Sequence, residues 1–374
     1  MPKIESLYAL LPDHGQQFLK SGGLSVVNQI GFDVIRRVIV DVLSGKNIRE
    51  STEFLTRKRL ASLNFSLVKL IFNGIEKDPN FLTNIGKIAS RILTEGGNSK
   101  QEKWLCNWAL GLTNKGVQNI LRDNTDGLDD YYKKYLDTNL EAASEAEDLF
   151  GDLEVNFELN DKSLELNWVE LSLIFNIVGS STLTIRGSEK SQYGKLFEKL
   201  ILGSILSILN FDYQSSKDEK NLQGKFWLSR QGEKRESDAT LFHNNGQGAR
   251  FDIGFIGRGN PEISLDKVSR FQRHIEVGKR NWEITTIILV DRVGNNSDIK
   301  EQARAVNGHL IEMSNNNWPK KVAEILSDEI DYYHEIKDLE DDDIEEYLNQ
   351  EVKKVPIKEI LGMNEGNQDL FNSS

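Results

Sequence analysis

Two aspartates stand out because each lies inside a short run of residues that favours a β-strand. Asp238 lies in "ESDATLFH" and Asp252 in "ARFDIGFIG", and the segment "NNGQG" joins the two runs. Strand interiors disfavour Asp. Because residues two apart share a face of a strand, each run keeps a mainly apolar face and turns its Asp to the opposite face. If the two runs pair as a hairpin, their carboxylates approach each other.

Two carboxylates at such a separation repel each other, and a cation between them relieves the repulsion. Mg²⁺ suits this arrangement, since it is bound through one or two carboxylates together with water and phosphate oxygens. There it would polarise a phosphate and stabilise a leaving oxygen. The alternative is that both aspartates form ordinary salt bridges on a solvated face, for instance with Arg235 or Arg250. The pair of strands alone leaves both interpretations open.

The elements predicted after residue 180 alternate between helices and strands. Helices are predicted over 188–211, 261–278, 298–306 and 317–332. Strands are predicted over 225–232, 236–243, 249–257, 284–292 and 308–314. Ser188 is a suitable N-cap for the first helix, and Asn260 followed by Pro261 suits the start of the second. Three successive strands predict a meander, and the later helical crossovers predict strands added in parallel.

The N-terminal part of the chain favours helices. Apolar residues recur at helical spacing over 26–45, 51–75 and 100–124, and a charged helix is predicted over 125–152. Residues 328–374 carry 15 acids against 4 bases, which predicts a solvated helix followed by disorder. Three regions are therefore predicted: a helical N-terminal domain over 1–155, a mixed α/β domain over 156–335 and an acidic C-terminal tail over 336–374.

Composition narrows the classes of function. The net charge of −12 disfavours nucleic acid for the chain as a whole, yet residues 181–280 carry 17 bases against 12 acids. Binding depends on the field at the contacting face, so a basic face remains compatible with DNA. The single Cys106 and five scattered histidines exclude a disulfide framework or a Cys/His metal cluster. Short apolar runs and the lack of a secretory signal predict a cytoplasmic protein without a membrane partner.

With these acids, the order of the elements resembles the PD-(D/E)xK nuclease fold of type II restriction endonucleases. Four longer strings are similar to the CfrBI family of restriction endonucleases: "RESTEFLTRKRLASLN", "IRGSEKSQYGKLFEKL", "EKRESDATL" and "RFDIGFIGRGNPEISLDKVSRF". The resemblance covers residues 1 to about 335. It implies an α/β fold class, in which a helical N-terminal region is followed by a PD-(D/E)xK-type mixed-sheet nuclease core. It also implies a prokaryotic, Mg²⁺-dependent endonuclease.

The resemblance implies three acids as metal ligands and catalytic groups: Glu198, Asp238 and Asp252. Glu198 shares a column of the 188–211 helix with residues that are small or apolar, so it is expected to face the sheet. These neighbours are Gly194, Leu202 and Ile205. A surface pairing of Glu198 with Lys195 or Lys199 is the alternative.

One position departs from the motif of the fold. The motif places a lysine two residues beyond the second acid, where this chain has Gly254. Lys267 is the predicted catalytic substitute, because it falls at the edge of the apolar stripe of the 261–278 helix and can lean towards the sheet. Lys234 and Arg235 are its rivals. A second register of the motif uses Asp252, Glu262 and Lys267.

Basic residues near these acids are the predicted DNA contacts: Arg186, Lys190, Lys234, Arg235, Arg258, Arg270 and Arg273. Most such residues contact only the DNA backbone. A homodimer matched to a palindromic site in double-stranded DNA is expected, and the resemblance implies a CCWWGG-type site. Two alternatives remain open: a repair or transposition nuclease of the same fold, and a non-catalytic DNA-binding relative that the missing lysine would permit.

Overall fold

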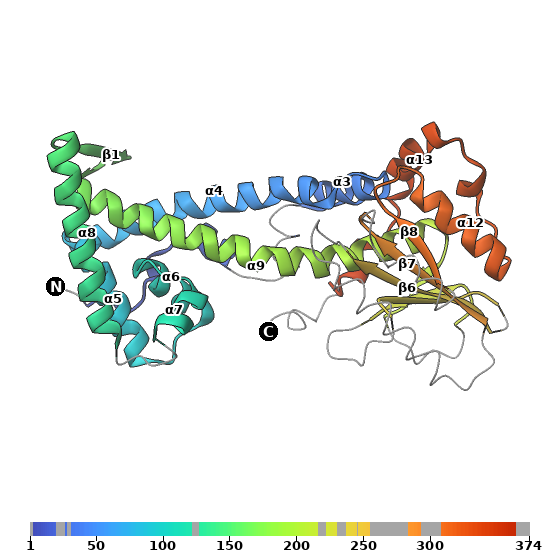
Figure 1. Ribbon diagram of the computed structural model, residues 1–374, viewed down its shortest axis with the longest axis horizontal. Helices are drawn as coiled ribbons and strands as arrows, with labels where there is room; N and C mark the ends of the chain where they lie inside the picture. The colour runs from blue at the N-terminus through green and yellow to red at the C-terminus, as the bar shows by residue number, and fades with distance from the viewer. Residues whose placement is uncertain are drawn as a thin grey trace. The chain divides into compact units, whose positions relative to one another are not determined.

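The computed structural model describes most of the chain in segments. These are residues 3–19, 27, 31–121, 127–215, 222–229, 237–244, 246–254, 283–292 and 308–363, with backbone only for 120–121 and 188–192. The chain forms two compact units, each built from segments distant in sequence (Figure 1). We call Met1–Ser21 with Thr56–Lys190 the helical unit, and Gly22–Leu55 with Ser191–Ser374 the sheet unit.

Helices dominate the first unit. Its short N-terminal helices are η1 (Tyr8–Leu10) and α1 (Asp13–Leu19), and its longer ones are α5 (Phe81–Glu95), α6 (Lys100–Ala109), α7 (Asn114–Leu121) and α8 (Leu128–Phe150). Two long helices, α4 (Ile48–Ile75) and α9 (Trp168–Ile208), contribute to both units. A hairpin of β1 (Val155–Leu159) and β2 (Lys162–Leu166) precedes α9. The helical N-terminal region predicted from the sequence is confirmed.

The single helix predicted over 100–124 is wrong, because the chain breaks between α6 and α7. Gly111 adopts φ +67°, a left-handed conformation that glycine reaches without steric cost. The N–H of Leu112 donates to the carbonyl of Asn107 at 2.8 Å and closes the end of α6. This is a usual way for a helix to end.

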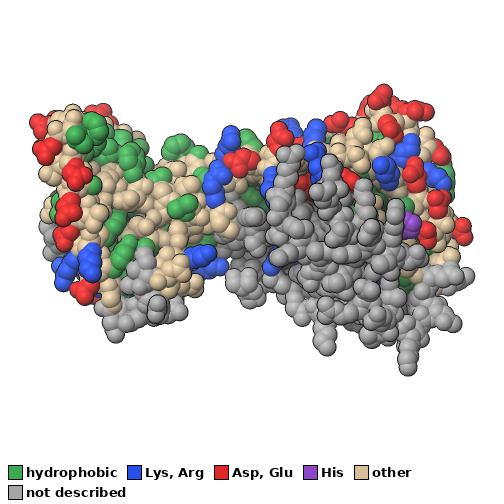
Figure 2. Space-filling model, viewed as in Figure 1, with side chains coloured by type: hydrophobic (Ala, Val, Ile, Leu, Met, Phe, Trp, Pro, Cys, Tyr) green, Lys and Arg blue, Asp and Glu red, His purple; other side chains and the backbone are tan. Residues whose placement is uncertain are grey.

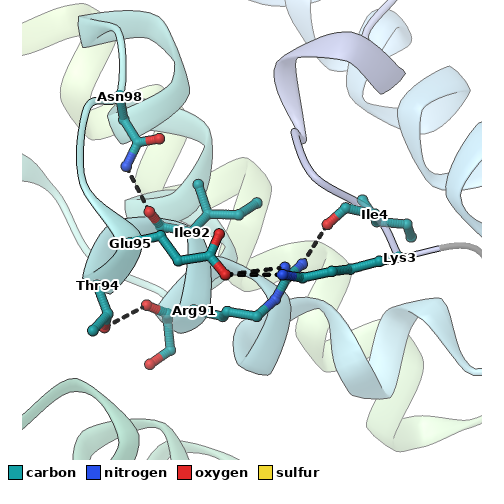
Figure 3. A network of polar contacts seen from close by, with 8 residues as sticks. Lys3, Ile4, Arg91, Ile92, Thr94, Glu95 and Asn98 are labelled. Atoms are coloured by element: carbon teal, nitrogen blue, oxygen red, sulfur yellow. Dashed lines mark hydrogen bonds and ion pairs between the residues drawn. The ribbon is translucent and has the colours of Figure 1, made fainter.

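Polar contacts attach the N-terminal segment to the other parts of the helical unit (Figure 3). The Glu95 carboxylate pairs with Lys3 at 3.0 Å and with Arg91 at 3.5 Å, and Arg91 also donates to the carbonyl of Ile4. Nearby, the buried carboxylate of Glu102 accepts from the backbone N–H of Leu7 at 2.8 Å. Hydrogen bonds of this kind satisfy a buried charge that would otherwise be costly.

The second unit is built on a six-stranded mixed sheet in the order β3-β4-β5-β6-β7-β8. Its strands are β3 (Asp212–Tyr213), β4 (Lys225–Leu228), β5 (Ala239–Phe242), β6 (Gln247–Gly254), β7 (Glu283–Val290) and β8 (Gly308–Glu312). The central strands β4, β5 and β6 pair antiparallel, while β7 and β8 are added in parallel. The predicted meander and the parallel additions are confirmed.

The core of the sheet unit lies on one face of this sheet. Buried apolar residues of the strands pack there with helices α3 (Phe32–Leu43), α12 (Trp318–Ile330) and the C-terminal half of α9. Trp318 is fully buried, and its indole N–H donates to the carbonyl of Val42 at 2.9 Å. This hydrogen bond joins α12 to α3 across most of the sequence.

The helix predicted over 188–211 begins much earlier, so Ser188 as its N-cap is wrong. In the structure α9 is a continuous helix of 41 residues that starts at Trp168. An N-cap needs a non-helical backbone, whereas the residues before Ser188 are helical themselves. By length and mean hydropathy (1.3) the segment Trp168–Gly187 could also cross a membrane. Its buried residues, such as Ile177 and Ile185, belong to the core of the helical unit, and a core helix meets the same criteria.

The expectation of a solvated tail is wrong for residues 335–361. This segment forms η3 (Glu335–Asp338), η4 (Asp341–Asp343), α13 (Ile344–Glu351) and α14 (Ile357–Ile360). Its apolar side chains are buried in the core of the sheet unit, while acidic side chains lie at the surface around α12 and α13 (Figure 2). Close packing extends to α9, since a Cβ on Gly203 would lie 2.8 Å from Cδ1 of Ile360. The acidic composition of residues 335–361 therefore does not show that this segment is amphipathic.

A buried histidine in this segment makes stability depend on pH. His334 is 3 % exposed, and its ring accepts a hydrogen bond from the N–H of Ile336 at 3.3 Å. Burial lowers the pKa of His334, while Glu335, the Ile208 carbonyl and Glu351 oppose that shift. The folded state therefore binds this proton less readily than the unfolded chain. The stabilising contribution is complete above the unfolded pKa of about 6.5 and is lost as the pH falls from that value through the lower folded pKa.

We expect His334→Asn to flatten the loss of stability between about pH 7.5 and about pH 5.5. Asn can still cap η3 but does not titrate in this range. Urea midpoints of both proteins at the two pH values measure the difference. His309→Gln is the matched control, because His309 is not buried and pairs with Glu329 at 3.1 Å. An unchanged pH slope in His334→Asn would contradict the assignment.

Candidate active site

The two aspartates singled out in the sequence come together at the start of β5. Strands β5 and β6 pair antiparallel with Ala239 opposite Phe251, so Asp238, the residue before β5, lies beside the part of β6 that carries Asp252. Two hydrogen bonds hold Asp238 against β6. The N–H of Asp238 donates to the carbonyl of Phe251 at 2.9 Å, and the N–H of Ile253 donates to Oδ2 of Asp238 at 3.0 Å.

The face of β6 that carries Asp252 is opposite to the apolar core. Phe251 and Ile253 belong to the buried core cluster, so the alternation along β6 turns Asp252 away from it. Asp252 is nevertheless only 8 % exposed, and Asp238 is half-buried. A carboxylate removed from water needs a compensating partner such as a cation or a donor. The hairpin therefore concentrates two acids in a sheltered position.

Other predicted site residues lie on α9. Glu198 is half-buried on α9, and Arg186 is exposed on the same helix. Among the described residues, no three His, Cys, Asp or Glu side chains are arranged to hold a metal ion. Lys190 lies on α9 where only the backbone is described. Seven predicted residues lie outside the described segments: Lys234, Arg235, Arg258, Glu262, Lys267, Arg270 and Arg273.

Comparison with known proteins decides the family. The family model described as CfrBI restriction endonuclease matches residues 32–298. The type II restriction enzyme CfrBI of Citrobacter freundii is 38 % identical over 347 residues, which cover 90 % of this chain and 93 % of that protein. The chain belongs to the CfrBI restriction endonuclease family. No solved structure matches it.

Membership of the CfrBI family makes this protein a site-specific deoxyribonuclease, as the resemblance in its sequence strings predicted. The family match includes the whole hairpin with Asp238 and Asp252. It also covers α3 of the sheet unit and α5, α6, α7 and α8 of the helical unit. The family match therefore includes segments of both units.

A further acid, at the carboxyl end of β7, was not predicted from the sequence. Asp291 directly follows β7, and its N–H donates to the carbonyl of Gly254 at 3.3 Å, so it flanks the carboxyl end of the strand that carries Asp252. Burial raises the pKa of Asp291, although Arg49 and Arg292 oppose the shift. An acid placed directly after the apolar run "TTIILV" was the signal that could have revealed it. Perturbed acids at strand ends are frequent in functional sites.

The donor set of the hairpin fits a hard divalent cation. Two opposed carboxylates provide the negative charge and oxygen ligands that Mg²⁺ accepts, and Mg²⁺ completes its coordination with water and substrate oxygens. Two protein ligands are therefore sufficient for a site that closes around a phosphate.

Proposed function

We propose that the protein is a type II restriction endonuclease that hydrolyses double-stranded DNA at a short palindromic sequence with the help of Mg²⁺. The observation that carries this proposal is that hydrogen bonds hold Asp238 against Phe251 and Ile253, the two neighbours of Asp252 in β6. The similarity of the chain to the type II restriction enzyme CfrBI supports the reaction class. A PD-(D/E)xK-type core agrees with the helix, meander and parallel strands that surround the two acids.

The role of each acid follows from charge and position. Asp238 and Asp252 would hold the divalent ion, which when bound polarises the phosphate and stabilises the leaving oxygen. The backbone N–H of Ile253 orients the Asp238 carboxylate by bonding one of its oxygens. We keep Glu198 as the proposed third ligand and Lys267 as the proposed basic group that replaces the lysine absent at Gly254. Lys234 and Arg235 remain the alternatives for that group.

The predicted DNA contacts are part of the same proposal. The basic residues are expected to bind phosphates, and these contacts would make affinity fall with salt concentration. A homodimer would match the two-fold symmetry of a palindromic site, for which a CCWWGG-type sequence is the candidate. We assign dimer and DNA contacts to the helical region 1–155, the nuclease to 156–335, and a cytoplasmic location in a bacterium to the whole protein.

Digestion of a sequenced plasmid tests the proposal directly. Purified protein with Mg²⁺ should produce discrete fragments, and sequencing of their ends should give one short recurring site with 5′-phosphates. A chelator should stop the reaction, because the metal ligands alone supply no nucleophile. A continuous smear would contradict site specificity, and undiminished cleavage in chelator would contradict the metal site.

A further inference from the structure

A basic residue shares the face of β6 that carries Asp252. Ala249, Phe251 and Ile253 point into the core of the sheet unit. Alternation along the strand therefore turns Arg250 and Asp252 to the opposite face. Residues two apart on a strand are separated by roughly 7 Å, which places the base of the Arg250 side chain at that distance from the base of the Asp252 side chain.

The neighbours of Arg250 across the sheet are uncharged. The register sets Arg250 beside Thr240 on β5 and beside Thr286 on β7. Both threonines are buried, at 8 % and 6 % exposure. The hydroxyl of Thr240 is already engaged with Ser237 Oγ at 2.8 Å. Arg250 thus stands between two small polar residues that leave it without a carboxylate beside it in the sheet.

The guanidinium of Arg250 has no partner among the residues that the structure describes. It forms neither a hydrogen bond nor an ion pair there, although Arg250 is half-buried. A partly desolvated cation is unfavourable unless an anion compensates it. The planar fork of a guanidinium matches two oxygens of a phosphate, which makes a phosphodiester a suitable anion.

We propose that Arg250 binds the scissile phosphate and is a catalytic residue of this nuclease. The inference rests on the proposed function, because it needs the phosphate to lie beside Asp238 and Asp252. The motif of the fold has its lysine two residues after the second acid, at Gly254, whereas Arg250 lies two residues before that acid. Steps of two residues in either direction keep a side chain on the same face. The chain therefore carries a positive charge on the required face, displaced in the opposite direction along β6.

The chemistry assigned to Arg250 is electrostatic. Water adds to phosphorus, the bond from phosphorus to the 3′-oxygen breaks, and that oxygen leaves with the bonding electrons and takes up a proton. The 5′-phosphate product keeps the oxygen of the water, whose proton is released. The role assigned to Arg250 involves no proton transfer, because a guanidinium does not act as a general base. It binds the non-bridging oxygens as negative charge accumulates on them.

Single-turnover cleavage of a duplex that contains the mapped site tests this role. Arg250→Ala and Arg250→Gln should each slow the cleavage step at saturating protein by about 100-fold or more. Binding of the same duplex, measured without metal, should weaken by less than about tenfold, as for one phosphate contact. Arg250→Lys should recover part of the rate, since it restores the charge but not the bidentate geometry. Arg37→Ala, which removes an exposed arginine of α3, is the control and should leave the rate unchanged.

The outcomes separate the inference from the function on which it rests. If Arg250→Ala and Arg250→Gln cleave at the wild-type rate while Asp252→Asn is inactive, Arg250 has no catalytic role and the inference is overturned. If all these variants cleave normally, the proposed site itself is wrong. A variant that loses only affinity and recovers full rate at saturation also overturns the catalytic role. Circular dichroism identifies a misfolded Arg250→Ala protein, in which case the Gln and Lys variants decide.

Discussion

Asp252→Asn and Asp238→Asn should each reduce cleavage by about 1,000-fold or more while the fold persists. Asn preserves the size of the side chain but removes the charge on which a metal ligand depends. The amide oxygen of Asn at position 238 can still accept from the N–H of Ile253, so the alignment of β5 and β6 is retained. Single-turnover rates at saturating Mg²⁺ measure the effect. Affinity for the uncut duplex should be unchanged or higher, because one negative charge near the phosphate is lost.

The metal dependence of these variants separates a ligand from a merely structural acid. Raising the Mg²⁺ concentration should partly restore cleavage in a variant that retains one of the two carboxylates. Asp212→Asn is the matched control, since Asp212 is an exposed acid on β3 at the edge of the same sheet. That control should cleave normally. Wild-type rates in either hairpin variant would remove Asp238 and Asp252 from the proposed metal site.

Deletion of residues 340–374 should unfold the sheet unit. It removes seven buried side chains of the core: Ile344, Leu348, Val352, Val355, Ile357, Ile360 and Leu361. Burial of that many apolar side chains stabilises a fold by on the order of 10 kcal/mol. This is comparable to the whole stability of an ordinary domain, about 5–15 kcal/mol. Loss of the cooperative urea transition of the sheet unit, together with loss of cleavage, is the expected result.

Smaller changes test whether these side chains are responsible. Deletion of 364–374 removes none of them and should preserve the transition. Leu348→Ala should lower the free energy of unfolding by about 2–5 kcal/mol, as expected when a fully buried leucine is truncated. Glu346→Ala on the exposed side of α13 should change it by less than about 0.5 kcal/mol. A truncated protein that keeps normal stability and cleavage would show that the segment is dispensable.

The sheet was predictable because its strands carry strong local patterns. Alternation and β-branched residues identified the runs around Asp238, Asp252 and Ile287, and the connections between them predicted the meander and the parallel strands. The β1–β2 hairpin was missed, although Val155, Phe157 and Leu159 alternate with polar residues. Asn160 at φ +56° forms its turn, a conformation that Asn tolerates better than most residues.

Predictions from the sequence were wrong where overall composition or a single residue type disagreed with the periodicity of the apolar residues. The C-terminal segment was assigned to solvent on its acids, but Ile344, Leu348, Val352 and Val355 follow helical spacing. The start of α9 was placed at Ser188, because a residue that favours N-caps also occurs inside helices when tertiary contacts hold the backbone. The discontinuous composition of the two units depends on contacts between distant segments, which local patterns do not contain.

The candidate site was predictable in part for the same reason. The position of Asp238 beside β6 depends on one hairpin, which local pattern and turn residues predict. Glu198 depends on the packing of a separate helix against the sheet, and sequence spacing does not determine that geometry. The sequence predicts Arg250 only as a salt-bridge partner, because the motif of the fold concerns the residues after Asp252 rather than those before it.

The hydrogen bond between Trp318 and Val42 has a consequence for the synthesis of the protein. It joins a helix made early in translation to one made near the end, and the later residues through Leu361 complete the same core. While these residues are still inside the ribosome, the emerging strands cannot acquire their full packing. Assembly that depends on contacts so distant in sequence is also slow. We therefore expect a nascent or prematurely terminated chain to lack the stable packing of the sheet unit.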